Sequence, residues 1–117
     1  MRITAFIALL LFCFSCEAPY QSEALVGNWK SVAWRNTTNG TAITTPVTFN
    51  FEPTERYEAT YGSNTEKGKY WIVEDNLHTI EDGKAEKKVR IAKLQNDTLV
   101  FEMNRAGNLE ELVLVKQ

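Results

Sequence analysis

The chain has 117 residues, of which 44% are apolar and 24% are charged, and its formal net charge is −2. This length allows one domain, and the apolar fraction is sufficient for a packed core, so a chain that is disordered throughout is excluded. The charge balance leaves no electrostatic footprint for nucleic acid. One His and two Cys cannot supply the four nitrogen and sulfur ligands of a structural zinc site.

The first 15 residues have the features of an export signal. A basic start at Arg2 precedes an uncharged, apolar run over residues 3–14, and this run is too short to span a bilayer, which takes about 20 residues. Residues 1–15 are therefore predicted to form a signal peptide that is removed on export. A buried first helix or strand is the alternative interpretation.

The apolar run ends at Ser15 and Cys16. This junction resembles the lipobox of bacterial lipoproteins, in which a small residue precedes a Cys that becomes the lipid-modified N-terminus. The resemblance implies that Cys16 is lipidated, that residues 16–23 form the lipid anchor and a polar tether, and that the protein is held on a membrane of the bacterial cell envelope, either inner or outer. An ordinary signal peptide that leaves Cys16 as a free thiol is the alternative.

Residues 24–117 alternate between apolar and polar positions in short runs, which is typical of strands with one buried face. Turn residues separate the runs, and Asp82-Gly83 predicts a type I′ hairpin turn. One helical turn is expected over residues 22–26. Eight strands are predicted: 25–34, 47–51, 56–61, 67–73, 76–81, 86–94, 98–104 and 109–116.

Connections this short make successive strands antiparallel neighbours. An open sheet of eight strands would expose two edges and a half-apolar face, and closure removes both problems. The predicted fold is therefore all-β, an eight-stranded antiparallel up-and-down β-barrel. The one long connection runs from residue 35 to residue 46.

Four segments carry a family resemblance: Gly27-Asn28-Trp29 within residues 25–30, and residues 47–51, 68–72 and 94–102. Together they are similar to the lipocalin-like domains of secreted bacterial lipoproteins. The resemblance implies that Gly27 and Trp29 form the structural motif at the closed end of the barrel, where the Trp packs under a basic side chain. Lys116 and Arg105 are the candidates for that side chain. It also implies that residues 35–46 lie over the open end as a lid.

Trp29 sets the inward parity of the first strand, which predicts that Ser31 and Ala33 face the interior while Trp34, like Trp71, faces outward. Two interpretations of the interior stay open, because an eight-stranded barrel is either filled by side chains or holds one small ligand. The second predicts a small apolar cavity at the lid end with tyrosine hydroxyls as polar contacts. Its candidate ligand-binding residues are Ser31, Ala33, Phe49, Tyr57, Ala59, Tyr61, Tyr70, Phe101 and Met103.

The chain carries no recognisable catalytic motif. His78 is the only imidazole and is expected at the surface, and no nucleophile elbow accompanies it. The acidic residues near Asp75, Glu81 and Asp82 do not reproduce the spacing of a calcium loop. The sequence therefore predicts a protein that is not an enzyme and that uses no metal and no cofactor.

The resulting hypothesis is a membrane-anchored lipocalin-like lipoprotein of the bacterial envelope that binds a small hydrophobic molecule. The alternative is a barrel filled by its own side chains that acts as an interaction or inhibitor module for an envelope protein or an enzyme. No nucleic-acid partner is expected, and the sequence makes no prediction of the oligomeric state.

Overall fold

The computed structural model describes residues 20–117. The predicted signal peptide, Cys16 and residues 17–19 of the predicted tether lie outside these residues. A short 3-10 helix, η1 (Ser22–Ala24), precedes the sheet. The strands are β1 (Gly27–Asn36), β2 (Val47–Phe51), β3 (Arg56–Tyr61), β4 (Asn64–Val73), β5 (Asn76–Glu81), β6 (Glu86–Gln95), β7 (Thr98–Arg105) and β8 (Asn108–Lys116).

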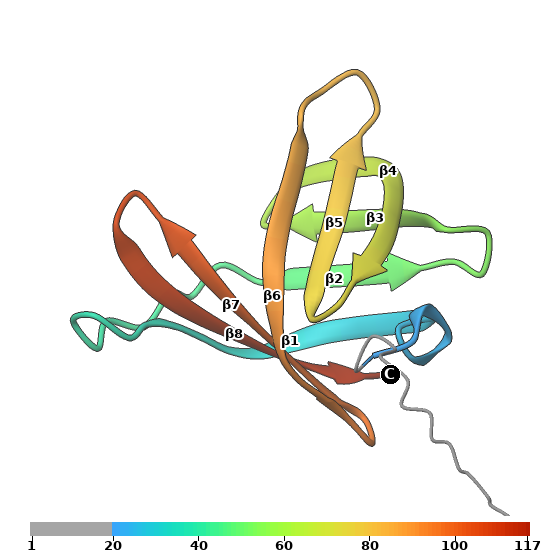
Figure 1. The fold of residues 1–117 in the computed structure, drawn as a ribbon. Coiled ribbons are helices and arrows are strands. Elements are labelled where there is room, and N and C mark those ends of the chain that lie inside the picture. The colour runs from blue at the N-terminus through green and yellow to red at the C-terminus, as the bar shows by residue number, and fades with distance from the viewer. Residues whose placement is uncertain (1–19) are drawn as a thin grey trace, which may run out of the picture.

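Each strand pairs antiparallel with the next, and β1 pairs with β8 to close the barrel (Figure 1). The predicted all-β, eight-stranded antiparallel barrel is therefore confirmed. The bounds of β2, β3 and β5 agree with the prediction, and β4 begins three residues earlier, at Asn64, because Tyr61 and Asn64 pair directly across the turn.

Two hairpins show how loop length selects the turn. Four residues separate β5 from β6, and only Gly83 of the Asp82-Gly83 pair has a positive φ, so the predicted type I′ turn is wrong. The two-residue connection between β7 and β8 instead places both Ala106 and Gly107 at positive φ, as that turn requires. The Gly107 N–H donates to Asn104 Oδ1 at 3.1 Å, which stabilises the hairpin.

A β-bulge in β1 changes which side chains face the interior. Ser31 pairs with Leu114 and Ala33 with Val113, so Val32 is an extra residue and is 61% exposed. Because side chains alternate with period two, one extra residue exchanges the two faces for the rest of the strand. Ala33 is exposed and Trp34 is buried, so the predicted inward Ala33 and outward Trp34 are both wrong.

Trp29 closes one end of the barrel. Its ring is 1% exposed, and its indole N–H donates to the carbonyl of Leu25 at 2.8 Å. The Lys116 ammonium lies 5.2 Å from the ring centroid, close enough for a cation–π contact. Lys116 is therefore the basic partner that the sequence left open between two candidates, and Arg105 lies over Trp34 instead.

The core lies inside the barrel and is rich in aromatic rings. Phe49 and Phe51 stack with their ring centroids 5.2 Å apart, and Tyr70 meets Phe51 edge-on at 4.9 Å. The buried core residues are Leu25, Trp29, Trp34, Val47, Phe49, Phe51, Tyr57, Ala59, Tyr70, Leu77, Ile91, Leu99, Phe101, Leu112 and Leu114.

Gly68 allows β4 and β5 to approach closely. A Cβ atom at this position would lie 2.0 Å from the carbonyl oxygen of Ile80 and 2.8 Å from the Cα of Glu81. Both are backbone atoms of the neighbouring strand, so they can give way only if the ladder itself shifts. Position 68 therefore has no room for a side chain, and only glycine fits there.

We expect Gly68→Ala to lower the free energy of unfolding by about 2–3 kcal/mol, because the added methyl group overpacks the β4–β5 ladder. Urea denaturation followed by tryptophan fluorescence measures the change. The exposed neighbour Lys67 provides the control, since Lys67→Ala should change stability by less than about 0.5 kcal/mol. Equal stability of the two variants would contradict the steric argument.

Candidate functional site

A cavity of about 580 Å³ occupies the barrel at the end opposite Trp29. All eight strands contribute to its lining, among them the second half of β1, the end of β3, the start of β6 and the end of β7. The Trp29 end is built from the start of β1 and the end of β8. The apolar lining residues are Trp34, Phe49, Leu77, Val89, Phe101, Met103 and Leu112. The polar ones are Tyr61, Glu66, Thr79, Lys87, Lys88, Asn104 and Arg105.

The cavity opens where β6 and β7 part. The ladder between these strands stops at the pair Arg90 and Glu102. Beyond it, residues 86–89 of β6 pair with β5, and residues 103–105 of β7 pair with β8. In Figure 1, β6 rises beside β5 while the β7–β8 hairpin turns away from it. Lining residues lie on both bordering strands, so this gap is the mouth of the cavity.

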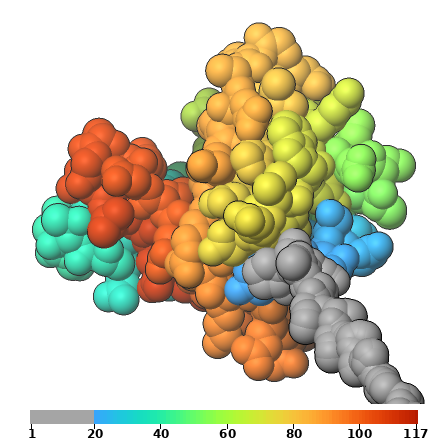
Figure 2. Space-filling model, viewed as in Figure 1, coloured from blue at the N-terminus to red at the C-terminus, as the bar shows by residue number. Residues whose placement is uncertain are grey.

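The long connection between β1 and β2 does not cover the mouth. Figure 2 shows it at one flank of the molecule beside the tip of the β7–β8 hairpin. The Thr37 N–H donates to the Leu109 carbonyl at 2.8 Å, and the Leu109 N–H donates to Thr38 Oγ1 at 3.1 Å. No residue between 37 and 46 lines the cavity, so the predicted lid is wrong: hydrogen bonds to β8 hold this segment to one side.

Four of the nine candidate ligand-binding residues line the cavity: Phe49, Tyr61, Phe101 and Met103. The other five lie elsewhere. Tyr57 and Ala59 are buried beneath the lining, and the Tyr70 hydroxyl donates to the Glu52 carbonyl toward the Trp29 end, at 2.9 Å. Ser31 accepts the N–H of Val47 at 3.0 Å. Ala33 faces solvent, as a consequence of the bulge.

Sequence reasoning missed the polar residues of the mouth. Glu66, Thr79 and Lys87 lie in predicted strands or next to their ends, and none of them is among the candidate ligand-binding residues. Thr79 is 8% exposed and pairs with Lys87, so the strand parity set by Leu77 would have placed both side chains inside. Arg105 shares the inward parity of Leu99 and Phe101 on β7, so it could have been found in the same way. Trp34 could not, because the bulge in β1 reverses the parity of that strand.

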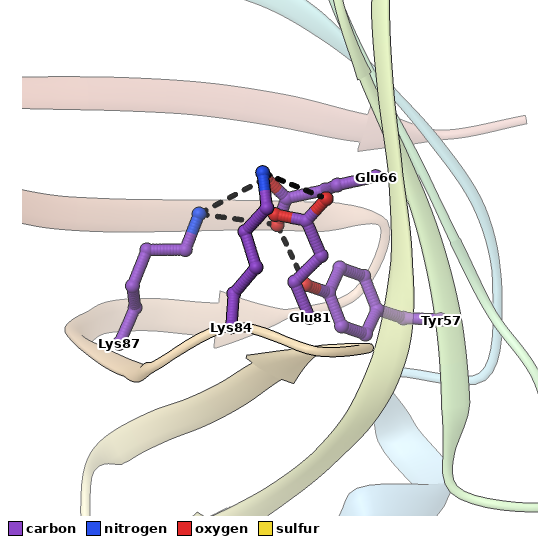
Figure 3. Close-up of polar contacts among 5 residues, drawn as sticks. All are labelled: Tyr57, Glu66, Glu81, Lys84 and Lys87. Atoms are coloured by element: carbon purple, nitrogen blue, oxygen red, sulfur yellow. Dashed lines mark hydrogen bonds and ion pairs between the residues drawn. The ribbon is translucent and has the colours of Figure 1, made fainter.

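Tyr57, Glu66 and Lys87 form a hydrogen-bonded triad at one side of the mouth (Figure 3). The Tyr57 hydroxyl donates to Glu66 Oε2 at 2.6 Å, and Lys87 Nζ lies 2.9 Å from Oε1 and 3.2 Å from Oε2. The Glu66 side chain is only 13% exposed, whereas that of Lys87 is 53% exposed. Burial, and then the Glu66 carboxylate, raise the pKa of Tyr57, so its hydroxyl stays a donor.

Trp34, Glu110 and Arg105 form a second triad of the same kind. Glu110 Oε1 accepts the indole N–H of Trp34 at 3.0 Å and lies 3.1 Å from Arg105 Nη1. The Arg105 guanidinium also lies over the Trp34 ring, 5.4 Å from its centroid. The carboxylate is again the buried member, at 8% side-chain exposure, and the cation is again exposed, at 57%.

Tyr61 adds a neutral hydroxyl to the cavity wall. Burial raises its pKa, the carboxylates of Glu66 and Glu81 raise it further, and Arg105 lowers it in part. None of the described residues bonds this hydroxyl through a hydrogen bond. Among the described residues it is therefore an unused donor and acceptor on the cavity wall.

His78 lies on the outer face of the sheet. Its ring stacks on Trp71 with the centroids 5.4 Å apart, and its Nδ1 is 2.6 Å from Glu86 Oε2. It does not line the cavity. Within residues 20–117, no group of three or more His, Cys, Asp or Glu is placed to hold a metal ion, and no helix is long and apolar enough to cross a membrane.

Comparison with known proteins agrees with this architecture. Residues 25–101 match the model of the lipocalin-like domain. The chain belongs to the lipocalin-like domain family. The structure is similar to the crystal structure of a lipocalin-like protein from Bacteroides uniformis, with a TM-score of 0.62 and 17% identity over 80% of this chain and 99% of the other.

A second similar structure is that of an uncharacterized protein from Bacteroides eggerthii. The TM-score is 0.58, with 12% identity over 79% of this chain and 98% of the other. At these identities both likenesses concern the fold. No curated protein sequence matches the chain.

We expect Tyr61 to make the fold sensitive to alkaline pH. Its folded pKa lies above the value of about 10 in an unfolded chain, so the native state keeps a proton that the unfolded state releases. Stability is therefore unaffected below about pH 10 and falls above it, by up to about 1.4 kcal/mol per pH unit.

Urea unfolding at about pH 9 and about pH 11 tests this expectation. Tyr61→Phe should match the original chain at the lower pH and lose less stability at the higher one. An identical loss in both proteins would show that the Tyr61 hydroxyl does not contribute.

Proposed function

We propose that this protein binds a small, largely apolar molecule in the cavity between β6 and β7. The cavity itself is the observation that supports this function. Its volume of about 580 Å³ falls within the range of about 300–1,000 Å³ that is typical of small-molecule sites. Half of its lining residues are apolar, and hydrogen bonds hold several of the polar ones, such as Glu66 and Lys87, in fixed positions.

The cavity favours a protein that binds a ligand inside the barrel over one whose barrel is filled by its own side chains. A barrel that acted only through its outer surface would gain stability from closing this space, because an unfilled hollow forfeits packing contacts. The bulge in β1 and the parting of β6 from β7 hold it open instead. Burial of apolar ligand surface at about 25 cal/mol per Å² would drive binding, and the proposed role is binding without catalysis.

We further propose that the protein is exported and anchored in the bacterial envelope through a lipid on Cys16. Cys16 lies four positions before Tyr20, which packs against the core just ahead of η1. A segment of that length reaches at most about 14 Å. An anchor there would keep the Trp29 end close to the membrane and direct the cavity away from it.

Replacing Cys16 tests the anchor. We expect Cys16→Ala to move the protein from the membrane fraction to the soluble envelope fraction, because the acyl chains that hold it on the bilayer are lost. Fractionation of cell envelopes followed by immunoblotting measures the shift. Retention of the variant on the membrane would mean that something other than a lipid on this residue holds the protein there.

A substitution that fills the cavity tests whether a small molecule binds there. The neutral probe N-phenyl-1-naphthylamine should bind the purified protein saturably with one site per chain, and Met103→Trp should weaken binding by at least about tenfold, since the indole would occupy the ligand space.

Val73→Trp is the matched control, because Val73 is 48% exposed and lies outside the cavity. This variant should bind the probe as the original chain does. An absence of saturable binding to the original chain, or equal binding to both tryptophan variants, would refute the proposal.

A further inference from the structure

The two triads share one arrangement. In each, an aromatic donor and a cation both bond one carboxylate: Tyr57 and Lys87 bond Glu66, and Trp34 and Arg105 bond Glu110. In each, the carboxylate is nearly buried and the cation is more than half exposed. A buried carboxylate with one bond already satisfied by an aromatic donor acts as a fixed support that holds the cation at the surface.

The supported cations lie on the two strands that border the mouth. Lys87 is on β6, beyond the last β6–β7 pair, and Arg105 is at the end of β7. Both line the cavity. Lys88 adds a third positive charge on β6, although its pairing with His78 turns it toward the outer face. The mouth therefore presents cations on both borders in a chain of net charge −2.

Both cations retain unused donors. The Lys87 ammonium carries three N–H bonds and the Arg105 guanidinium five, and within residues 20–117 each has one carboxylate as its hydrogen-bond partner. A further carboxylate beside the Glu66 triad, that of Glu81, lies 3.9 Å from Lys84 (Figure 3). An anionic group that entered the mouth would meet free N–H donors first, with the carboxylates behind them.

We propose that the ligand is an amphipathic anion: its apolar part occupies the cavity, and its negatively charged head group lies in the mouth between Lys87 and Arg105. The shared chemistry is an oxyanion on an apolar body, supplied by a carboxylate or a phosphate. This inference rests on the proposed function, because it assigns the polar end of the molecule that the cavity takes.

A pair of probes with one apolar skeleton tests the head group. 1-Anilinonaphthalene-8-sulfonate carries a sulfonate on the skeleton of N-phenyl-1-naphthylamine. The purified protein should bind the sulfonate at least about tenfold more tightly than the neutral probe. Raising the salt concentration from about 50 mM to about 500 mM should weaken the binding of the sulfonate probe only, since salt screens the exposed charges.

Two paired variants locate the effect. Glu66→Gln with Lys87→Met, and Glu110→Gln with Arg105→Met, each remove a cation together with its carboxylate, so that no buried charge is left unpartnered. Each should reduce the preference for the sulfonate over the neutral probe several-fold, because the ratio of the two affinities reports the head group alone. Lys93→Met, an exposed lysine of β6 outside the cavity, should change neither.

Displacement of the sulfonate probe by dodecanoate, dodecyl phosphate and dodecanol then identifies the head group. The anion that displaces it at the lower concentration names the source, and dodecanol should be weaker than both. Three results would overturn the head-group assignment but not the proposed binding in the cavity. They are equal affinity of the two probes, binding of the sulfonate probe that does not change with salt, and an unchanged preference for the sulfonate in both paired variants. If neither probe binds, the proposal that the cavity binds a small molecule is refuted as well.

Discussion

The pairing of β1 with β8 is the constraint on which the rest of the molecule depends. Without it the alternating strands would form an open sheet with one exposed apolar face and two free edges. With it, the apolar side chains of all eight strands meet in one interior. The same ladder contains the bulge at Val32, so the contact that closes the barrel also decides that Trp34 faces inward, where it lines the cavity.

Closure leaves a second requirement, because the backbone cannot hydrogen-bond across the gap where β6 and β7 part. Each strand instead keeps its outer partner, β5 for one and β8 for the other. The cations of the two triads, Lys87 on β6 and Arg105 on β7, border this gap and stay exposed to water. A mouth built in this way remains polar at its border and apolar behind it. This arrangement suits the proposed ligand, whose apolar part would lie in the cavity.

The sequence was sufficient for the architecture because the alternation of apolar residues is a local signal with a direct geometric meaning. It placed eight strands, their order and the position of Trp29, and it proposed Lys116 among two candidates. It failed where one residue changes the outcome without a local mark. Nothing in the run Ser31-Val32-Ala33 announces a bulge, and the bulge alone reversed Ala33 and Trp34. The prediction of a lid was wrong for a similar reason. Thr37 donates to the Leu109 carbonyl and Thr38 accepts the Leu109 N–H, and these contacts join residues that are distant in the sequence.

The two ends of the barrel use the same pair of groups to opposite effect. At the closed end, Trp29 donates its indole N–H to a backbone carbonyl, and Lys116 lies over the ring with its stem against Gly27. At the open end, Trp34 donates to the carboxylate of Glu110, and Arg105 lies over the ring. The difference is the acceptor. At the closed end a backbone carbonyl accepts the indole N–H, so the cation contacts the aromatic face and the pair closes the barrel. At the open end a buried carboxylate accepts the indole N–H, and the same carboxylate binds the cation and holds it at the border of the mouth. Tyr57, Glu66 and Lys87 repeat the second arrangement from another strand, so the polarity of the barrel is set by where its sequence places two glutamates.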